Sequence, residues 1–219
     1  RAPMTALADQ MLLSQAAYEG SDAVMAPLMG NHDVARIISD INGDELYQPR
    51  HIRPALPTSS ESYDLLTMAW TFTLTQPGAP VIYYGDEVAL PGANDPDNRR
   101  PMIFGDQLPT QSQRILSHAQ FVGSLRTNLT ALRRGALTIL HADEDTRVYQ
   151  RSTDGEQPIV VAFNRSHSAS SIVLAWSSDK GVNPTTTFGS TVHHSDTEIE
   201  LILGPRSSEL ILFQGNTSA

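Results

Sequence analysis

The sequence has no cysteine and a single lysine, Lys180, among its 219 residues. The absence of cysteine excludes disulfide bonds and thiolate metal sites. Acidic residues outnumber basic ones, 24 against 15, which gives a formal net charge of −9. Proteins that grip the phosphate backbone of nucleic acid need clustered Lys and Arg side chains. We therefore expect no nucleic acid among the partners of this chain.

Long apolar runs are also missing. No stretch of the sequence reaches the roughly 20 consecutive apolar residues that cross a bilayer, so we expect no membrane partner. Asp9 and Glu19 interrupt the first twenty residues, which contain no apolar core of a signal peptide. The composition, 40% hydrophobic and 18% charged, is typical of a folded globular chain.

The pattern of apolar and turn-forming residues changes at Gly135. Before it, helical periodicity alternates with short apolar runs, which predicts an α/β fold with parallel strands. The predicted helices run from Met4 to Gly20, from a Thr58–Glu61 capping box to about Thr75, and from Ile115 to a left-handed cap at Gly135. The run "PVIYYG", residues 80–85, does not alternate, which predicts a strand buried on both faces. After Gly135, short strand-like runs separated by turn residues predict an antiparallel all-β domain.

The stretch "PLMGNHDVARI", residues 27–37, carries the strongest functional signal. Asn31, His32 and Asp33 follow a short apolar run directly, which favours a site at the end of a buried strand. Two unrelated chemistries use such a triplet. One cleaves phosphate esters with a pair of metal ions, and the other cleaves sugars with carboxylates.

The two-metal phosphoesterase requires more ligands than this motif supplies. No histidine precedes Gly30, and the neighbouring His193 and His194 lie in the β-rich part. In a strand, these two side chains would point to opposite faces, which is wrong for joint ligation of a metal. This interpretation stays as the alternative.

Several segments resemble the α-amylase superfamily, glycoside hydrolase family thirteen. "GNHDVARI" is similar to the end of its seventh barrel strand, and "PGAPVIYYGDE" is similar to its eighth strand. "NDPDNRRPM" resembles the following loop of neopullulanases and cyclomaltodextrinases. "VVAFN" and "EIELILGPRSSELILF" resemble strands of the C-terminal β-sandwich. The resemblance runs over nearly the whole chain, in the expected order.

This resemblance implies a fold and an activity. Residues 1–135 would be the closing part of a (β/α)8 TIM barrel, an α/β fold, and residues 136–219 an antiparallel β-sandwich. The enzyme would cleave α-1,4-glucosidic bonds of starch or maltodextrins with retention. Its nucleophile and its acid/base would lie upstream, in a missing N-terminal barrel segment, so this chain alone is predicted to be inactive. We expect no cofactor in this chain, and calcium is possible in the full-length enzyme.

The same resemblance suggests roles for single residues. Asp33 and His32 would be catalytic and would grip sugar hydroxyls where cleavage occurs. Asn31, Asp95 and Arg99 would bind substrate in and beyond that subsite. Each residue also has a structural interpretation: Asn31 can hold a turn, and Asp95 and Arg99 can form an internal salt bridge. A non-catalytic starch-binding fragment is a third possibility, in which Trp176 and Phe188 would stack on glucan, although isolated aromatic residues in a sandwich are usually core.

Overall fold

A computed structural model describes residues 2–47, 53–176 and 182–215. The chain divides into two compact units, the first made of residues 1–25 and 129–219, and the second of residues 26–128. The first unit contains the helices α1 (Met4–Tyr18) and α5 (Thr130–Arg134) and all the strands β1–β8. The strand bounds are β1 Ala136–Ala142, β2 Thr146–Ser152, β3 Ile159–Asn164, β4 Ser170–Ala175, β5 Val182–Thr186, β6 Thr191–His194, β7 Glu198–Leu203 and β8 Ser207–Gly215.

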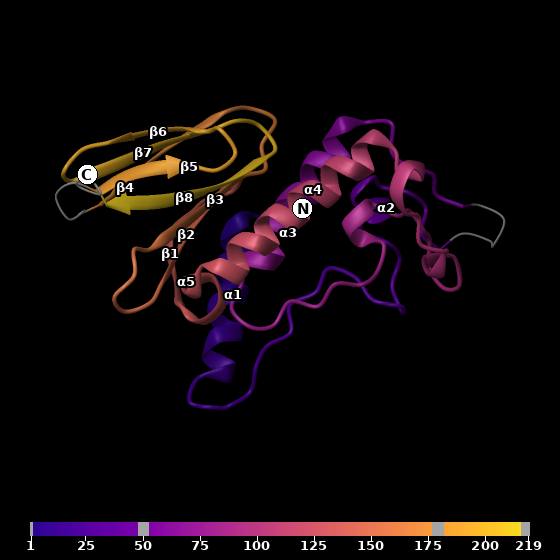
Figure 1. Cartoon of the computed structure of the whole chain (residues 1–219), viewed down its shortest axis with the longest axis horizontal. Helices are drawn as coiled ribbons and strands as arrows, with labels where there is room; N and C mark the ends of the chain where they lie inside the picture. The colour runs from indigo at the N-terminus through magenta and orange to yellow at the C-terminus, as the bar shows by residue number, and fades with distance from the viewer. Residues whose placement is uncertain (1, 48–52, 177–181, 216–219) are drawn as a thin grey trace. The chain divides into compact units, whose positions relative to one another are not determined.

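The strands of the first unit form two antiparallel sheets (Figure 1). One has the order β1-β2-β3-β8-β5, and the other has the order β4-β7-β6. Alternate residues of both sheets meet in one apolar core, which contains Val160 and Phe213 from the first sheet and Leu174 and Leu201 from the second. Two sheets that share a core in this way are a β-sandwich, as the sequence predicts for residues 136–219.

The second face of the larger sheet is also covered. Helix α1 contacts β1 and β2, and Figure 1 shows it beside these strands. It buries Met4, Ala8 and Met11, whereas Leu13 on its opposite side is 65% exposed. Every residue of β3, which lies in the middle of this sheet between β2 and β8, is buried. The first helix thus groups with the sandwich in this structure, and the predicted boundaries 1–135 and 136–219 stay a prediction.

The second unit is built around the helices α3 (Ser60–Thr75) and α4 (Thr110–Asn128), with the short α2 (Ile37–Ile41) and the 3₁₀ turns η1 (Asp86–Val88), η2 (Asp97–Arg99) and η3 (Gly105–Gln107). Trp70 and Leu66 of α3 pack with Ile115 of α4 in its core. The Ser59 side chain accepts a hydrogen bond from the Glu61 amide at 3.2 Å. The N-cap of α3 is therefore Ser59, one residue later than the predicted Thr58.

The long helix predicted to end at Gly135 is broken at Leu129, so that α4 and α5 are separate. Gly135 has a φ of −67°, so the left-handed cap expected there is wrong. Glycine is required at this position for a different reason. A Cβ at this position would lie 2.5 Å from the Ala131 carbonyl oxygen and 2.6 Å from that of Ser152, closer than any side chain tolerates.

The two predicted strands of the second unit meet in one parallel bridge, between Leu28 and Val81. The Val81 amide donates to the Pro27 carbonyl at 2.9 Å. The expectation that residues 80–85 are buried on both faces is wrong for this structure, because Val81 is 48% and Ile82 51% exposed. The described part of the chain contains a single parallel bridge with helices beside it and no closed barrel. This agrees with the prediction that the chain holds only the closing part of a barrel.

Within the described ranges, no helix combines the length and the apolar character that a membrane crossing requires.

Candidate active site

The Asn31–Asp33 turn follows the bridged residue Leu28 after Met29 and Gly30. The Asn31 side-chain oxygen accepts a hydrogen bond from the Asp33 amide at 2.8 Å, and this bond closes the turn. His32 and Asp33 project outwards, with side chains 64% and 72% exposed. Their nearest polar atoms, His32 Nε2 and Asp33 Oδ1, are 3.3 Å apart. The turn therefore presents an imidazole and a carboxylate side by side.

Glycine before this turn is required by close packing. A Cβ on Gly30 would lie only 2.7 Å from Oδ2 of Asp86, which sits directly behind it. Any larger residue would have to push the buried Asp86 carboxylate away. Gly30 therefore allows the strand end to lie against the residues that follow the second strand.

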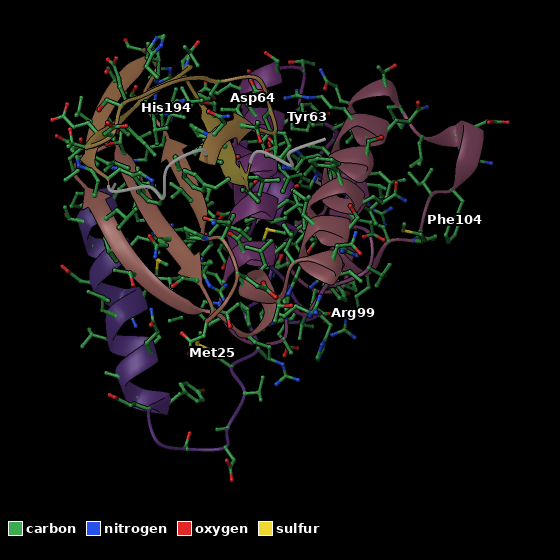
Figure 2. The ribbon with its side chains drawn as sticks, turned by 60° about the vertical axis from the view of Figure 1, so that its left-hand side comes forward. Met25, Tyr63, Asp64, Arg99, Phe104 and His194 are labelled. Atoms are coloured by element: carbon green, nitrogen blue, oxygen red, sulfur yellow. The ribbon has the colours of Figure 1, made fainter. Side chains whose placement is uncertain are left out.

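The loop that contains η2 lies against the Asn31–Asp33 turn. Asp95 Oδ1 and Arg99 Nε form an ion pair at 3.0 Å, with side chains 56% and 49% exposed. Arg99 also donates from Nη2 to the His32 carbonyl oxygen at 3.3 Å. Figure 2 shows Arg99 at the surface of its unit. The two segments that the sequence suggested for sugar binding are thus neighbours, and the predicted internal salt bridge is present.

A second ion pair holds the interior of this loop. Arg100 makes two bonds to Asp97, Nη2 to Oδ2 at 2.5 Å and Nε to Oδ1 at 3.0 Å. The Ala93 amide donates to the same carboxylate at 2.9 Å. Burial raises the pKa of Asp97, but these bonds and the charge of Arg100 outweigh it, so the pKa lies below its ordinary value. Asp97 therefore stays ionised and keeps the loop folded.

Beneath the turn, Arg36 and Asp86 form a buried ion pair, Nη1 to Oδ1 at 3.1 Å, with side chains 1% and 2% exposed. The guanidinium lies 4.2 Å from the ring centroid of Tyr83 and 4.6 Å from that of Tyr84. Arg36 therefore has a structural role beneath the turn, with Asp86 as its partner. Burial is the largest influence on Asp86 and raises its pKa to about 6, despite the opposing charge of Arg36.

A metal centre lacks support in the described residues, where no group of three or more His, Asp or Glu side chains is placed to hold an ion. His193 and His194 lie in β6, within the first unit, whereas His32 belongs to the second. The two-metal phosphoesterase is therefore the weaker interpretation of the triplet.

Comparisons with known proteins agree with the sugar interpretation. No family model matches the chain. The cyclomaltodextrinase of Geobacillus thermopakistaniensis is 32% identical over 149 residues, which are 67% of this chain and 22% of that protein. Neopullulanase 2 of Thermoactinomyces vulgaris is 28% identical over 190 residues, 86% of this chain and 29% of that protein. The solved α-amylase of Geobacillus thermoleovorans, complexed with acarbose, aligns over 98% of this chain and 44% of its own length, with a TM-score of 0.74 and 22% identity.

A parallel bridge before an exposed polar turn, joined in sequence to a β-sandwich, is the arrangement expected of part of a barrel with a C-terminal sandwich. With these relatives, the chain belongs to the α-amylase superfamily and is similar to the C-terminal part of its enzymes. It spans between a fifth and a third of the length of these curated relatives. The roles of His32, Asp33, Asn31, Asp95 and Arg99 in binding or catalysis stay predictions.

Proposed function

We propose that this chain is the C-terminal part of a retaining glycoside hydrolase that acts on α-1,4-glucosidic bonds of starch or maltodextrins. One observation carries the proposal. The exposed Asn31–Asp33 turn lies at the end of a strand in parallel register with a second strand, and the Asp95–Arg99 pair lies beside it. Barrel enzymes keep their chemistry at the C-terminal ends of their strands.

Asp33 acts on the charge of the transition state. Cleavage passes through an oxocarbenium-like state, and hydrogen bonds to sugar hydroxyls strengthen as it forms. The Asp33 carboxylate accepts from these hydroxyls, and His32 donates to them. A negative charge close to the catalytic acid also raises the pKa of that acid and keeps it protonated. Asn31 holds the turn in place and leaves both side chains free to point outwards.

Asp95 and Arg99 bind sugar units further from the cleaved bond. Asp95 offers acceptor oxygens and Arg99 a rigid fork of donors, and both are about half exposed while they pair with each other. Their mutual ion pair does not prevent this role, because a carboxylate and a guanidinium each have further lone pairs or protons to offer. Contact with the His32 backbone brings the pair close to the cleavage subsite.

The nucleophile and the acid/base are supplied by an N-terminal barrel segment outside this chain. The exposed apolar residues of the two bridged strands, Leu28 at 48%, Val81 at 48% and Ile82 at 51%, support such a partner. Neighbouring barrel strands would pair with these strands and cover their side chains. The acarbose bound to the solved α-amylase relative supports an oligosaccharide ligand. Calcium in the complete enzyme stays a prediction.

The test is Asp33→Asn in the complete enzyme, with Asp40→Asn as a matched control on an exposed aspartate of the same segment. Asp33→Asn keeps the size and removes the charge, so kcat should fall by about a hundredfold or more while KM changes by only a few fold. The control should keep the kcat of the parent. The isolated 219-residue chain, assayed on maltoheptaose and starch, should show no turnover. A rise in KM alone would make Asp33 only a binding residue, and unchanged kinetics would refute the proposal.

A further inference from the structure

Asn98 is wholly buried in the middle of η2, whereas its neighbour Arg99 is exposed. Its side-chain nitrogen donates to two backbone carbonyls, those of His32 and Val34, each at 2.8 Å. These carbonyls lie on either side of Asp33. Two acceptors around one nitrogen also fix the orientation of the amide, because an oxygen in that place would face two other oxygens. Asn98 therefore holds the backbone on both sides of the Asp33 carboxylate.

Asn98 is itself held by the buried Arg36. The Arg36 guanidinium donates from Nε to the Asn98 carbonyl oxygen at 2.7 Å. The same guanidinium pairs with Asp86 and packs on two tyrosine rings, so it has little freedom to move. The Arg36 amide adds a bond to the Gly92 carbonyl at 3.0 Å. Arg36, which follows the turn in sequence, thus joins the turn to the loop through fixed hydrogen bonds.

From this geometry we infer that Asn98 is a positioning residue, which sets the place of Asp33 relative to the Asp95–Arg99 pair. The inference rests on the proposed function, because it concerns how two sugar-binding groups of that site are held in register. Among the described residues, the other side chain of the loop that bonds the backbone of residues 31–34 is Arg99, through its 3.3 Å contact to the His32 carbonyl. It comes from an exposed arginine and is the weaker support.

Asparagine is suited to this role by its chemistry. Its amide carries two N–H donors on a short side chain, and both carbonyl acceptors use them. Aspartate has the same shape but would turn a carboxylate towards two carbonyl oxygens. Serine offers a single donor, and alanine offers none. Loss of these bonds leaves two backbone carbonyls without their buried partner and lets the loop shift away from the turn.

The experiment is a double-mutant cycle in the complete enzyme, with kcat/KM measured on maltotriose and on an aryl α-glucoside. In the parent, Arg99→Ala should lower the ratio of maltotriose to glucoside activity by about tenfold, the effect of one hydrogen bond to a charged group. In an Asn98→Ala background, the same change should lower the ratio by less than about twofold, because Arg99 is already misplaced. Ser62→Ala is the matched control, since the buried Ser62 donates a partly buried hydrogen bond to Asn42 in the same unit. In that background, the full effect of Arg99→Ala should remain.

An equal effect of Arg99→Ala in the parent and Asn98→Ala backgrounds would overturn the inference and leave Asn98 a residue of general stability. This failure is separable from failure of the proposed function. If Asp33→Asn leaves both kcat and KM unchanged, the function itself is wrong. If Asp33→Asn abolishes turnover and the cycle is additive, only the role of Asn98 is wrong.

Hydrogen exchange on the 219-residue chain gives a second, activity-free readout. Asn98→Ala should speed amide exchange at residues 31–36 by about tenfold relative to Ser62→Ala, with α3 and α4 unchanged. Unchanged protection of residues 31–36 would overturn the inference. If Asn98→Ala does not fold, Asn98→Ser replaces it in both experiments, with the same decisive outcomes. Unfolding of both variants would count against a positioning role.

Discussion

The buried Arg36–Asp86 pair makes a sharp prediction about pH. The pair lies under the turn, and burial raises the pKa of Asp86 to about 6 from an unfolded value of 3.8. Arg36 opposes this rise through its charge and hydrogen bond, and Glu87 adds to it slightly. An acid with a raised folded pKa stabilises the fold fully below its unfolded pKa, and this stabilisation is lost as pH rises through the folded value. Asp86→Asn removes this titration and keeps the shape.

The magnitude follows from the shift. Each pKa unit corresponds to about 1.4 kcal/mol, so the movement from 3.8 to about 6 is worth about 3 kcal/mol of unfolding free energy. The unfolding free energy of the parent should therefore fall by about 3 kcal/mol relative to Asp86→Asn between about pH 4 and pH 6. The attraction between ionised Asp86 and Arg36 already contributes to the folded pKa of about 6, so it is not counted a second time.

Urea unfolding of both proteins at several pH values between about 3.5 and 7 measures the difference directly, because other titrating groups cancel between them. Asp97→Asn is a control of opposite sign. The folded pKa of Asp97 is lowered, so its stabilisation is present above the unfolded pKa of 3.8 and is lost as pH falls below it. If the difference in unfolding free energy between the parent and Asp86→Asn does not change with pH, the burial argument is refuted. If the parent instead becomes more stable relative to the variant as pH rises, the attraction of Arg36 outweighs burial.

Two further predictions concern other parts of the second unit. In the complete enzyme, Asp95→Ala and Arg99→Ala should lower kcat/KM on maltotriose and longer substrates more than on an aryl glucoside. Equal losses on all substrates with a lower Tm would mean that the two residues only form a structural salt bridge. Burial lowers the pKa of His118 to about 4 from 6.5, so stability is lost as pH falls between these values, by about 3 kcal/mol. NMR titration of His118 checks this, and a midpoint near 6.5 would contradict it.

The sequence predicted the elements whose signals are local. The helix that ends at Thr75 is indicated by a capping box at its start, and β3 and β8 show apolar runs bounded by turn residues. The Asn31–Asp33 turn was also accessible, because Asn31 bonds the amide two residues on, a pattern that needs no tertiary partner. The Asp95–Arg99 pair, four residues apart, is of the same kind.

The residues beneath the site were not accessible in this way. Arg36 finds its partners at Asp86 and Asn98, about fifty and sixty residues further along the chain. Spacing alone can pair only near neighbours, such as Arg36 with Asp40 four residues on, and cannot reveal partners this distant. Only the sequence positions of these partners gave a signal. Asp86 comes directly after the second strand segment, and Asn98 lies in the middle of the polar loop.

The strands of the two units show how far a burial pattern can be trusted. The run of β3 is apolar without alternation, and in the structure all its residues are buried, one face of the strand in the sandwich core. The run "PVIYYG" is also apolar without alternation, yet Val81 and Ile82 are about half exposed. The two cases differ only in their neighbours, since β3 pairs on both sides and Val81 has a single bridge to Leu28. Apolar side chains on both faces are unfavourable in water, at about 25 cal/mol for each Å² left uncovered. The sequence of residues 80–85 is therefore suited to a sheet with more strands than the described residues supply, which is the physical reason to expect the rest of a barrel beside it.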